Sequence, residues 1–584
     1  MKTHNHLILE LAKRVEKAAL ELGATLTLEE AYSAIVEPPQ FEMGHFAFGC
    51  FRLAKAMKKA PPAIAAELAT KIQSDDMLKS VSAAGPYLNF IINAKAYGDL
   101  VINPVLDESF FKREILETNP KTMIEYSQPN THKVLHVGHM RNLCLGNALI
   151  KMGRSINADI ISVTYPGDVG THVAKCLWYL KKHNNSPIPE GSPETKGAWL
   201  GQIYTKASHK LDDELGTDQE EKNRAELTAI LKQLESGSGE YFDLWRETRE
   251  WSLRLMEKAY SWADVKFDRW FFESEVDAPS LKFIKELFDQ GKLVKDDGAI
   301  GMDLTDDKLG FCLLVKSDGN GLYATKDVQL AKVKFEEFKV KKSVYIVDNR
   351  QSHHFKQVFK VLEKIGFDQA KDCFHLAYDV VELPDGAMSS RKGNIVPLMD
   401  LVEQMEARIT TDYLEKYRGD WSNEEIKQTA HAVAGGAIIY GMVRVDNNRK
   451  IVFDMDEWLK LDGETGPYLQ YARARITSLV DKLGPVEENI DFTQLKTNAE
   501  LMLASKISRY NDIIEKGWND LKTIGLCSYL YDLSRLFNSF YVECPIGKAE
   551  TNELKQARLA LAKATGGILE HGLAALGITA PKRM

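Results

Sequence analysis

The residues with the clearest potential for chemistry lie in one stretch, "SQPNTHKVLHVGHMRN", at positions 127–142. Within it, His136 and His139 lie three residues apart with Gly138 between them. Such a pair could belong to a metal site, to a phosphate-binding loop, or to the polar residues that cap a helix. Zinc would need a third and a fourth ligand, and the nearest cysteine is Cys144. The HExxH zinc motif also differs, because it uses a spacing of four and an intervening glutamate.

The position of this stretch favours phosphate binding. A strand-like run, "TMIEYS", ends at Ser127, and a helix is expected to begin near Gly138. A helix N-terminus that follows a strand presents unpaired N–H groups and the positive end of the helix dipole to an anion. Gly138 lets a ligand approach the backbone closely, and Lys133 and the histidines add donors. The stretch therefore predicts a cradle for the phosphates of ATP.

Two acidic residues elsewhere could bind a cation. Tyr323 and Asp327 are four residues apart on a predicted helix, so they share one face, although an isolated pair of this kind is more often a surface contact. Glu125 lies inside the apolar strand-like run, where a carboxylate is costly unless it is paired. A substrate cation would supply that partner, and the alternative is a glutamate that faces outward.

The elements that must position these residues alternate between strands and helices from about 120 to 385. The strand-like runs are "TMIEYS", "ADIISVTYPGD", "FCLLVKSDG", "SVYIVD" and "CFHLAYDVVEL". This alternation indicates a parallel sheet with helices on both faces. Ligands bind such sheets beyond the carboxyl ends of the strands, at the point where strand order reverses. A charged, Trp-rich stretch at about 180–262 is expected to be a helical insertion.

The flanking regions predict different structures. The first 115 residues or so indicate a small α+β unit, with a helix at about 5–22 and a strand at "GPYLNFIIN". In "AFGCFRLAKAMKKA", four basic residues recur at helical spacing, namely Arg52, Lys55, Lys58 and Lys59. They predict either a solvated helix face or a contact with a polyanion. After about residue 395 the pattern is almost entirely helical.

Length and composition set the outer limits. A chain of 584 residues is too long for one core, and three to five domains are expected at roughly 150 residues each. None of the seven cysteines forms a CxxC pair, so we expect neither a zinc site nor a disulfide framework, and reduced thiols suit the cytoplasm. A net charge of −8 argues against indiscriminate coating of nucleic acid, but local basic faces could still bind RNA. No signal peptide or membrane span is expected.

Several ordered segments resemble those of class I aminoacyl-tRNA synthetases, and among these the arginyl-tRNA synthetases. "HVGH" is similar to the HIGH signature of the class, and "EYSQPNTHKVLHVGHMRN" to its arginyl version. The other similar segments are "YPGDVGTHVAKCL", "KSDGNGLYATKDVQLA", "VDNRQSHHF", "MSSRKGN", "GETGPYLQYARARI" and "LGITAPKRM". More loosely, "PPQFEMGHFAFGCFRLAK" resembles the N-terminal domain of the family. Together they span nearly the whole chain.

The resemblance implies an α/β multidomain fold. It comprises an N-terminal α+β additional domain that contacts tRNA, a Rossmann-type parallel-sheet catalytic domain, a helical connecting region and an all-helical anticodon-binding bundle. The expected boundaries are 1–115, 116–395 with the insertion at about 180–262, 396–455 and 456–584.

The resemblance also implies the site residues. The arginine-binding positions are Glu125, Asn130, His139, Tyr323, Asp327 and Gln351. Asp327 would pair with the guanidinium and Tyr323 would wall it, while Asn130, His139 and Gln351 would hold the α-amino and carboxylate end. The ATP-binding positions are His136, Gly138, His139, Met388, Ser389 and Arg391. Mg²⁺ would arrive bound to ATP, and no dedicated metal site is expected.

One motif departs from the family pattern. In "DGAMSSRKGN", Ala387 and Ser390 stand where the KMSKS motif has its two lysines, and Arg391 and Lys392 follow. Members of the family that lack the second lysine typically carry one just before the HIGH signature, where this chain has Lys133. We therefore expect Lys133, together with His136, His139 and Lys392, to form the catalytic set.

The implied partners are L-arginine, ATP and an arginine-accepting tRNA, which would receive arginine on its terminal 2′-OH. Activation of arginine in this family typically needs tRNA. Anticodon bases could stack on tyrosines such as Tyr468, Tyr471 and Tyr541. A monomer is expected. Rival interpretations are a class I synthetase for cysteine, glutamate or lysine, or a tRNA-binding paralogue without activity. The absence of zinc-ligand cysteines argues against the cysteine enzyme, and the presence of Glu125 and Asp327 argues against the other two. Intact His136, Gly138, His139 and Asp327 argue against the inactive paralogue.

Overall fold

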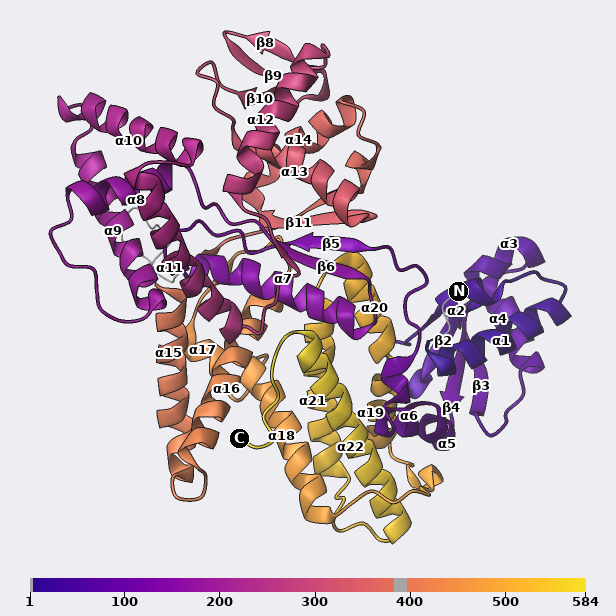
Figure 1. Cartoon of the computed structure of the whole chain (residues 1–584). Helices are drawn as coiled ribbons and strands as arrows, with labels where there is room; N and C mark the ends of the chain where they lie inside the picture. Colours follow the sequence, from indigo (N-terminus) through magenta and orange to yellow (C-terminus); the bar gives the residue numbers. More distant parts are fainter. Residues whose placement is uncertain (1–3, 383–395) are drawn as a thin grey trace.

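The structure is a computed structural model that describes residues 4–382 and 396–584 (Figure 1). A parallel sheet lies at the centre, a small α+β unit lies to one side, and long helices extend away from the sheet. No helix in the described part of the chain is both long and apolar enough to cross a membrane.

The N-terminal unit contains an antiparallel sheet of order β1-β2-β4-β3. Its strands are β1 (Ile35–Val36), β2 (Phe46–Gly49), β3 (Leu78–Ala84) and β4 (Tyr87–Ile92), and its long helices are α1 (His6–Glu21) and α4 (Pro61–Lys71). Asn5 caps α1 by accepting a hydrogen bond from the Ile8 N–H, which satisfies one of the free donors of the first turn.

The predicted helix through "AFGCFRLAKAMKKA" is wrong. Its first residues form β2, in which Phe46 and Phe48 are buried and pair with β4, and only Ala54–Met57 forms an α-helical turn, α3. Residues 46–48 are all buried, and their pairing with β4 outweighs the helical spacing of the lysines. Lys58 takes a left-handed conformation with φ 50°, which ends the turn. The basic residues therefore share no continuous helix face.

The central sheet is parallel, with strand order β12-β11-β5-β6-β7. Its strands are β5 (Thr122–Glu125), β6 (Ile160–Thr164), β7 (Arg269–Trp270), β11 (Lys342–Asp348) and β12 (Cys373–Tyr378). The first strand in sequence lies in the middle and the chain runs outward on both sides, which is the Rossmann order with its switch point between β5 and β11. The predicted Rossmann-type catalytic domain is confirmed.

One predicted strand of that sheet belongs elsewhere. "FCLLVKSDG" forms β10 (Gly310–Val315), which pairs antiparallel with β9 (Ala299–Leu304) in a separate sheet that also contains β8 (Val294–Asp296). The connections between these strands are short turns, whereas a parallel neighbour requires a crossover of a dozen or more residues. The two-residue β7 was too short for its sequence to reveal it.

Helices cover both faces of the parallel sheet. Glu125 is in register with Val163 of β6 and Tyr345 of β11, and in-register residues of parallel strands point to one face. That face packs on α13 (Tyr323–Phe338) and α14 (Ser352–Lys364). The opposite face, which includes Ile124 and Val344, packs on α7 (Val137–Ser155).

The predicted insertion is a group of four helices beside the sheet (Figure 1). They are α8 (Thr171–Lys182), α9 (Pro193–Asp213), α10 (Gln219–Ser236) and α11 (Glu240–Trp262). The fully buried Asp168, which follows β6, ties the insertion to the sheet: it pairs with Arg249 of α11 at 2.7 Å, and its backbone carbonyl accepts a hydrogen bond from Trp245.

The C-terminal half is helical, as the sequence predicts. Its main helices are α15 (Leu398–Ile409), α16 (Asn423–Val443), α18 (Gly466–Leu483), α19 (Asn498–Ser508), α20 (Tyr510–Asp520), α21 (Ile524–Glu543) and α22 (Asn552–Ala575). Helices α16 and α18 cross closely, because a Cβ on Gly466 would overlap the backbone carbonyl of Gly436.

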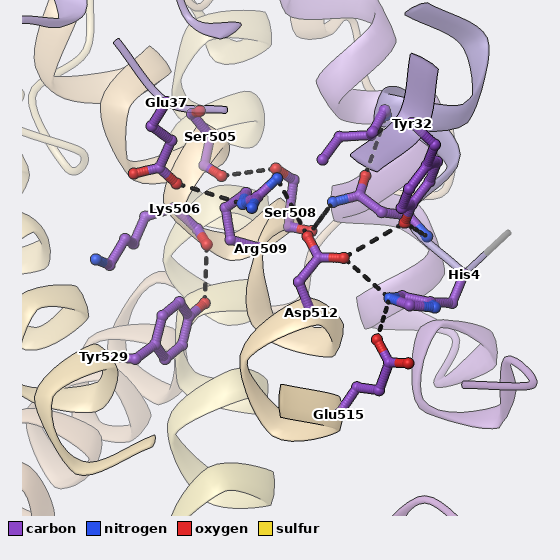
Figure 2. A network of polar contacts seen from close by, with 12 residues as sticks. His4, Tyr32, Glu37, Ser505, Lys506, Ser508, Arg509, Asp512, Glu515 and Tyr529 are labelled. Atoms are coloured by element: carbon purple, nitrogen blue, oxygen red, sulfur yellow. Dashed lines mark hydrogen bonds and ion pairs between the residues drawn. The ribbon is translucent and has the colours of Figure 1, made fainter. Parts of the chain in front are cut away.

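A polar junction joins the N-terminal unit to α20 (Figure 2). The carboxylate of Asp512 accepts hydrogen bonds from His4 Nε2 at 2.9 Å and from Asn5 Nδ2 at 2.8 Å. Helix α20 in turn packs on α7, where Met152 Sδ lies beside Gly517. The junction thus connects the N-terminal unit, through one helix, to the helix that begins with the paired histidines.

Candidate active site

The paired histidines form the N-terminus of α7, directly after the loop that follows β5. His136 is the N-cap residue, and its Nδ1 accepts a hydrogen bond from the Gly138 N–H at 3.0 Å. The His136 N–H donates to His139 Nδ1 at 3.2 Å, and the two rings are 4.0 Å apart. Because both Nδ1 atoms accept hydrogen bonds, the proton of each neutral ring is on Nε2. Each Nε2–H can then donate a hydrogen bond to a phosphate oxygen.

Both rings are neutral at neutral pH. Burial, together with the charge of Lys133, lowers the pKa of His136 to about 4. Burial, and then the electrostatic influence of His136 and Lys133, lower the pKa of His139 well below its usual value. The pair can therefore donate hydrogen bonds to a phosphate while the positive charge at this corner comes from Lys133 and the helix terminus.

Lys133 faces both the histidines and the helical insertion. Its ammonium group lies 4.7 Å from the ring centroid of Tyr204 on α9. After burial, its charge is the largest influence that lowers the pKa of His172, to about 3. Lys133 also lines a cavity of about 1400 Å³ between α9, α11 and the start of α15, together with Trp199 and Met399.

The loop before the histidines is held by buried polar contacts. Ser127 and His132 both have left-handed backbones, with φ values of 54° and 60°. The side chain of His132 is buried between the hydroxyls of Thr131 and Thr248, at 2.9 and 2.8 Å. This third histidine of the motif therefore holds the loop against α11 and does not join the pair.

The far end of the same corner is close to α15. Val137 donates to the Val396 carbonyl at 3.3 Å, and Leu398 donates to the Leu135 carbonyl at 2.9 Å. Residues 396–398 are therefore paired with the loop that carries the histidines. The predicted site residues Met388, Ser389, Arg391 and Lys392 lie outside the described residues.

The expectation that a substrate cation pairs with Glu125 is wrong. Its buried carboxylate pairs with Lys334 Nζ at 2.5 Å, and the side chain of Lys334 is fully buried. Gln128 also donates to the carboxylate at 3.3 Å. The internal ion pair satisfies the charge that the sequence left unpaired, because α13 brings Lys334 to the face of the sheet from which Glu125 projects.

Asp327 is the predicted arginine-binding carboxylate, and a second carboxylate, Glu273, which the sequence did not indicate, pairs with the residue that precedes Asp327 in α13. Asp327 Oδ2 lies 2.6 Å from His354 Nε2, and Glu273 pairs with Lys326 at 2.6 Å. Burial, and then the charges of Asp327 and Glu273, raise the pKa of Tyr165 well above its usual value. Burial raises the pKa of Glu273, and the charge of Lys326 opposes that shift. A carboxylate at the first position of a helix after a short strand was the available signal for Glu273.

Asn130 and Tyr323, two other predicted arginine-binding residues, lie close to these carboxylates. Asn130 pairs with Gly167 in an isolated bridge, and a Cβ on Gly167 would lie 3.2 Å from Glu273 Oε2, so Asn130 and Glu273 approach each other there. Tyr323 begins α13 with 69% of its side chain exposed. Gln351 is exposed at the end of the 3-10 turn Asn349–Gln351.

For a metal site at the paired histidines, the described part of the chain provides no further ligands. Within residues 4–382 and 396–584, no group of three or more His, Cys, Asp or Glu side chains could hold a metal ion. His136 and His139 also use their Nδ1 atoms for the helix cap.

A Rossmann sheet whose first helix begins with a His-x-Gly-His pair at the switch point defines the catalytic domain of a class I aminoacyl-tRNA synthetase. The family model "tRNA synthetases class I (R), catalytic domain" matches residues 102–455. "Arginyl tRNA synthetase N terminal domain" matches residues 5–92, and "DALR anticodon binding domain" matches residues 469–584. The chain belongs to the arginyl-tRNA synthetase family.

Relatives and solved structures agree along the whole chain. It is 55% identical over 557 residues to an arginine–tRNA ligase of Bdellovibrio bacteriovorus, covering 95% of each chain. It is 34% identical over 575 residues to one of Clostridium perfringens, covering 98% of this chain and 100% of the relative. The arginyl-tRNA synthetase structure of Thermus thermophilus matches its fold with a TM-score of 0.81 at 24% identity, covering 98% of this chain and 99% of the other.

Proposed function

We propose that this protein is an arginine–tRNA ligase that forms arginyl-adenylate from L-arginine and ATP and then transfers arginine to tRNA, as a step of protein biosynthesis. The observation that carries the proposal is the juxtaposition of two features at one end of the sheet. Neutral histidines cap α7 at the switch point, and the carboxylates of Glu273 and Asp327 lie nearby around Tyr165. The first suits ATP phosphates, and the second suits a guanidinium group.

Asp327 and Glu273 are the proposed guanidinium acceptors, because a planar fork of donors is best matched by carboxylates. Tyr323 would cover the side chain of arginine from the solvent side. Asn130 and Gln351 would hold its α-amino and carboxylate end, with His139 at the junction with ATP. In this proposal Glu125 supports the pocket from below, through its pair with Lys334.

The adenylation step needs alignment and charge neutralisation more than a base, since the arginine carboxylate is already a nucleophile. His136, His139 and the N–H of Gly138 would bind the phosphate oxygens. Lys133 would supply the charge that the altered KMSKS motif lacks. Met388, Ser389, Arg391 and Lys392 would contact ATP from the other side, a role supported by the pairing of residues 396–398 with the histidine loop. Mg²⁺ would come with ATP and would help to neutralise the charge of its phosphates.

The tRNA would contact both ends of the chain. We assign residues 1–115 as an additional tRNA-contacting domain, 396–455 as a connecting region and 456–584 as the anticodon-binding domain. Tyr471 is 38% exposed and offers a stacking surface for an unpaired base, whereas Arg475 covers one face of the Tyr541 ring at 4.7 Å. The Tyr468 hydroxyl already accepts a hydrogen bond from Asn538 Nδ2 at 2.8 Å, so Tyr468 is the weaker candidate. Activation would require bound tRNA, and the enzyme would act as a cytoplasmic monomer.

The direct test is charging of total tRNA with each of the twenty amino acids in labelled form, in the presence of ATP and Mg²⁺. Label from arginine alone is expected in acid-precipitable tRNA. An Asp327→Ala variant should lose most of the charging, because it removes a carboxylate acceptor for the cation. Charging with lysine, glutamate or cysteine at the rate of arginine would contradict the proposal.

A further inference from the structure

The acidic region, which comprises Glu273 and Asp327, also contains a buried tyrosine hydroxyl. Tyr165 follows β6, and its Oη atom is buried without a hydrogen-bond partner among the described residues. Most buried polar side chains have a partner, so an exception at the edge of a binding site needs an explanation. A ligand that supplies the missing hydrogen bond is one such explanation.

The register of the sheet places Tyr165 on the substrate side. Glu125 is paired with Val163, and side chains of a strand alternate between faces, so Tyr165 continues on the face of Val163 and Glu125. Tyr165 also packs against the hydrophobic core between the sheet and α13. Asp327 projects from that same helix.

The negative charges of four carboxylates influence this hydroxyl. Burial raises the pKa of Tyr165 well above its usual value, and the further contributions come from Asp327, Glu273, Glu125 and Asp168. Three of the four have an internal cation as partner, which is Lys326, Lys334 or Arg249. Among the described residues, the ion-pair partner of Asp327 is a histidine, His354. The region is thus rich in hydrogen-bond acceptors.

A guanidinium group matches this arrangement. It carries five N–H donors in a plane and no acceptor, so it can donate to Asp327 and to a hydroxyl oxygen at the same time. A tyrosine hydroxyl can accept one N–H while it donates its own proton to a carboxylate. The ammonium group of lysine is a compact point charge that cannot present this fixed fork.

We propose that the Tyr165 hydroxyl is a specificity-determining contact for arginine, which accepts one guanidinium N–H beside Asp327. The inference rests on the proposed function, since it assumes that arginine occupies this pocket. It adds a residue from the β6 end of the sheet to those expected from α12 (Glu273–Asp289) and α13.

The test is Tyr165→Phe, which removes one oxygen and keeps the ring. We expect the KM for arginine in tRNA charging to rise about 10- to 100-fold, the range for a hydrogen bond to a charged group, with the KM for ATP unchanged. The matched control is Tyr126→Phe. Tyr126 Oη is also buried without a partner in the described residues, but its ring packs beside Gly146 of α7, on the opposite face of the sheet.

The unfolding temperature separates binding from structure. Because the hydroxyl of Tyr165 has no partner in the described protein, Tyr165→Phe should unfold at or above the wild-type temperature. The proposal is overturned if the arginine KM of Tyr165→Phe equals that of Tyr126→Phe, or if the unfolding temperature of Tyr165→Phe falls, which would reveal a structural partner. Failure of the wild-type protein to charge arginine would instead overturn the proposed function.

Discussion

At the scale of single residues, hydrogen-bond donation and positive charge come from different residues at the N-terminus of α7. A charged histidine would supply both. His136 and His139 cap the helix through Nδ1 and remain neutral donors, while Lys133 carries the positive charge. A neutral donor can stay hydrogen-bonded to a phosphate throughout a reaction, and a fixed cation stabilises the charge that develops on phosphorus and on pyrophosphate.

Lys133 is therefore expected to matter for the rate more than for substrate binding. Lys133→Ala should lower arginine-dependent ATP–pyrophosphate exchange by about 10²- to 10³-fold, the range for loss of one preorganised donor. Lys206→Ala is a suitable control, because this exposed lysine lines the same cavity. Exchange by Lys133→Ala near the wild-type rate would refute the role of Lys133 as the replacement for the KMSKS lysine.

The buried histidines also determine how the stability of the protein should depend on pH. Burial lowers the pKa of His132 and of His172 to about 3, against 6.5 for the exposed side chain. Below pH 6.5 the unfolded chain therefore binds protons that the folded chain does not, so stability falls as the pH falls from 6.5 toward 3. Each such group should contribute a slope of up to about 1.4 kcal/mol per pH unit.

Thermal unfolding between pH 5 and 8 measures this slope. His132→Gln should flatten it, whereas His353→Gln, at an exposed position, should leave it unchanged. Equal slopes for the two variants would show that the burial of His132 does not act on stability in this way.

At the scale of elements, α7 and α13 are the two helices that carry the site, and they pack on opposite faces of the sheet. Their positions were predictable, because each begins directly after a recognisable loop and has a regular apolar pattern. The Glu125–Lys334 pair was not predictable, since its members are 209 residues apart and only the completed sheet brings them together. Likewise, β7 and the antiparallel position of β10 depend on connections whose geometry local propensity does not encode.

The contact of α7 with β5 should be intolerant of added volume. A Cβ on Gly146 would overlap the ring of Tyr126, so Gly146→Ala should destabilise the protein by about 1–3 kcal/mol. Gly435→Ala in α16 is the matched helical control, because a Cβ there meets nothing within 4 Å, and it should stabilise by roughly 0.5–1 kcal/mol. Unfolding temperatures should therefore move in opposite directions. A shift of the same sign in both would refute the packing argument.

At the scale of the whole molecule, the Asp512 junction in Figure 2 connects the two ends of the chain that we expect to contact tRNA. One hydrophobic core extends from α1 through α7 into the C-terminal helices, so these parts share packed surfaces. The similarity to known sequences predicted the order of the regions. The junction itself, which pairs residues about 500 positions apart, could be seen only in the fold.

Asp512→Asn should weaken this junction. The variant removes the charge that faces His4 and Arg509, and breaking a largely buried pair costs about 3 kcal/mol. Hydrogen exchange should then increase in residues 5–92 and in α20. Asp76→Asn is the control, since the Asp76 side chain is 95% exposed in the same N-terminal unit. Unchanged exchange in Asp512→Asn would mean that apolar packing alone holds the N-terminal unit in place.

The central claim is that this fold activates arginine and no other amino acid. ATP–pyrophosphate exchange with each of the twenty amino acids, with and without total tRNA, tests it most directly. We predict exchange with arginine only, and only when tRNA is present. Exchange with a different amino acid, or no exchange with arginine in the presence of its tRNA, would contradict the claim.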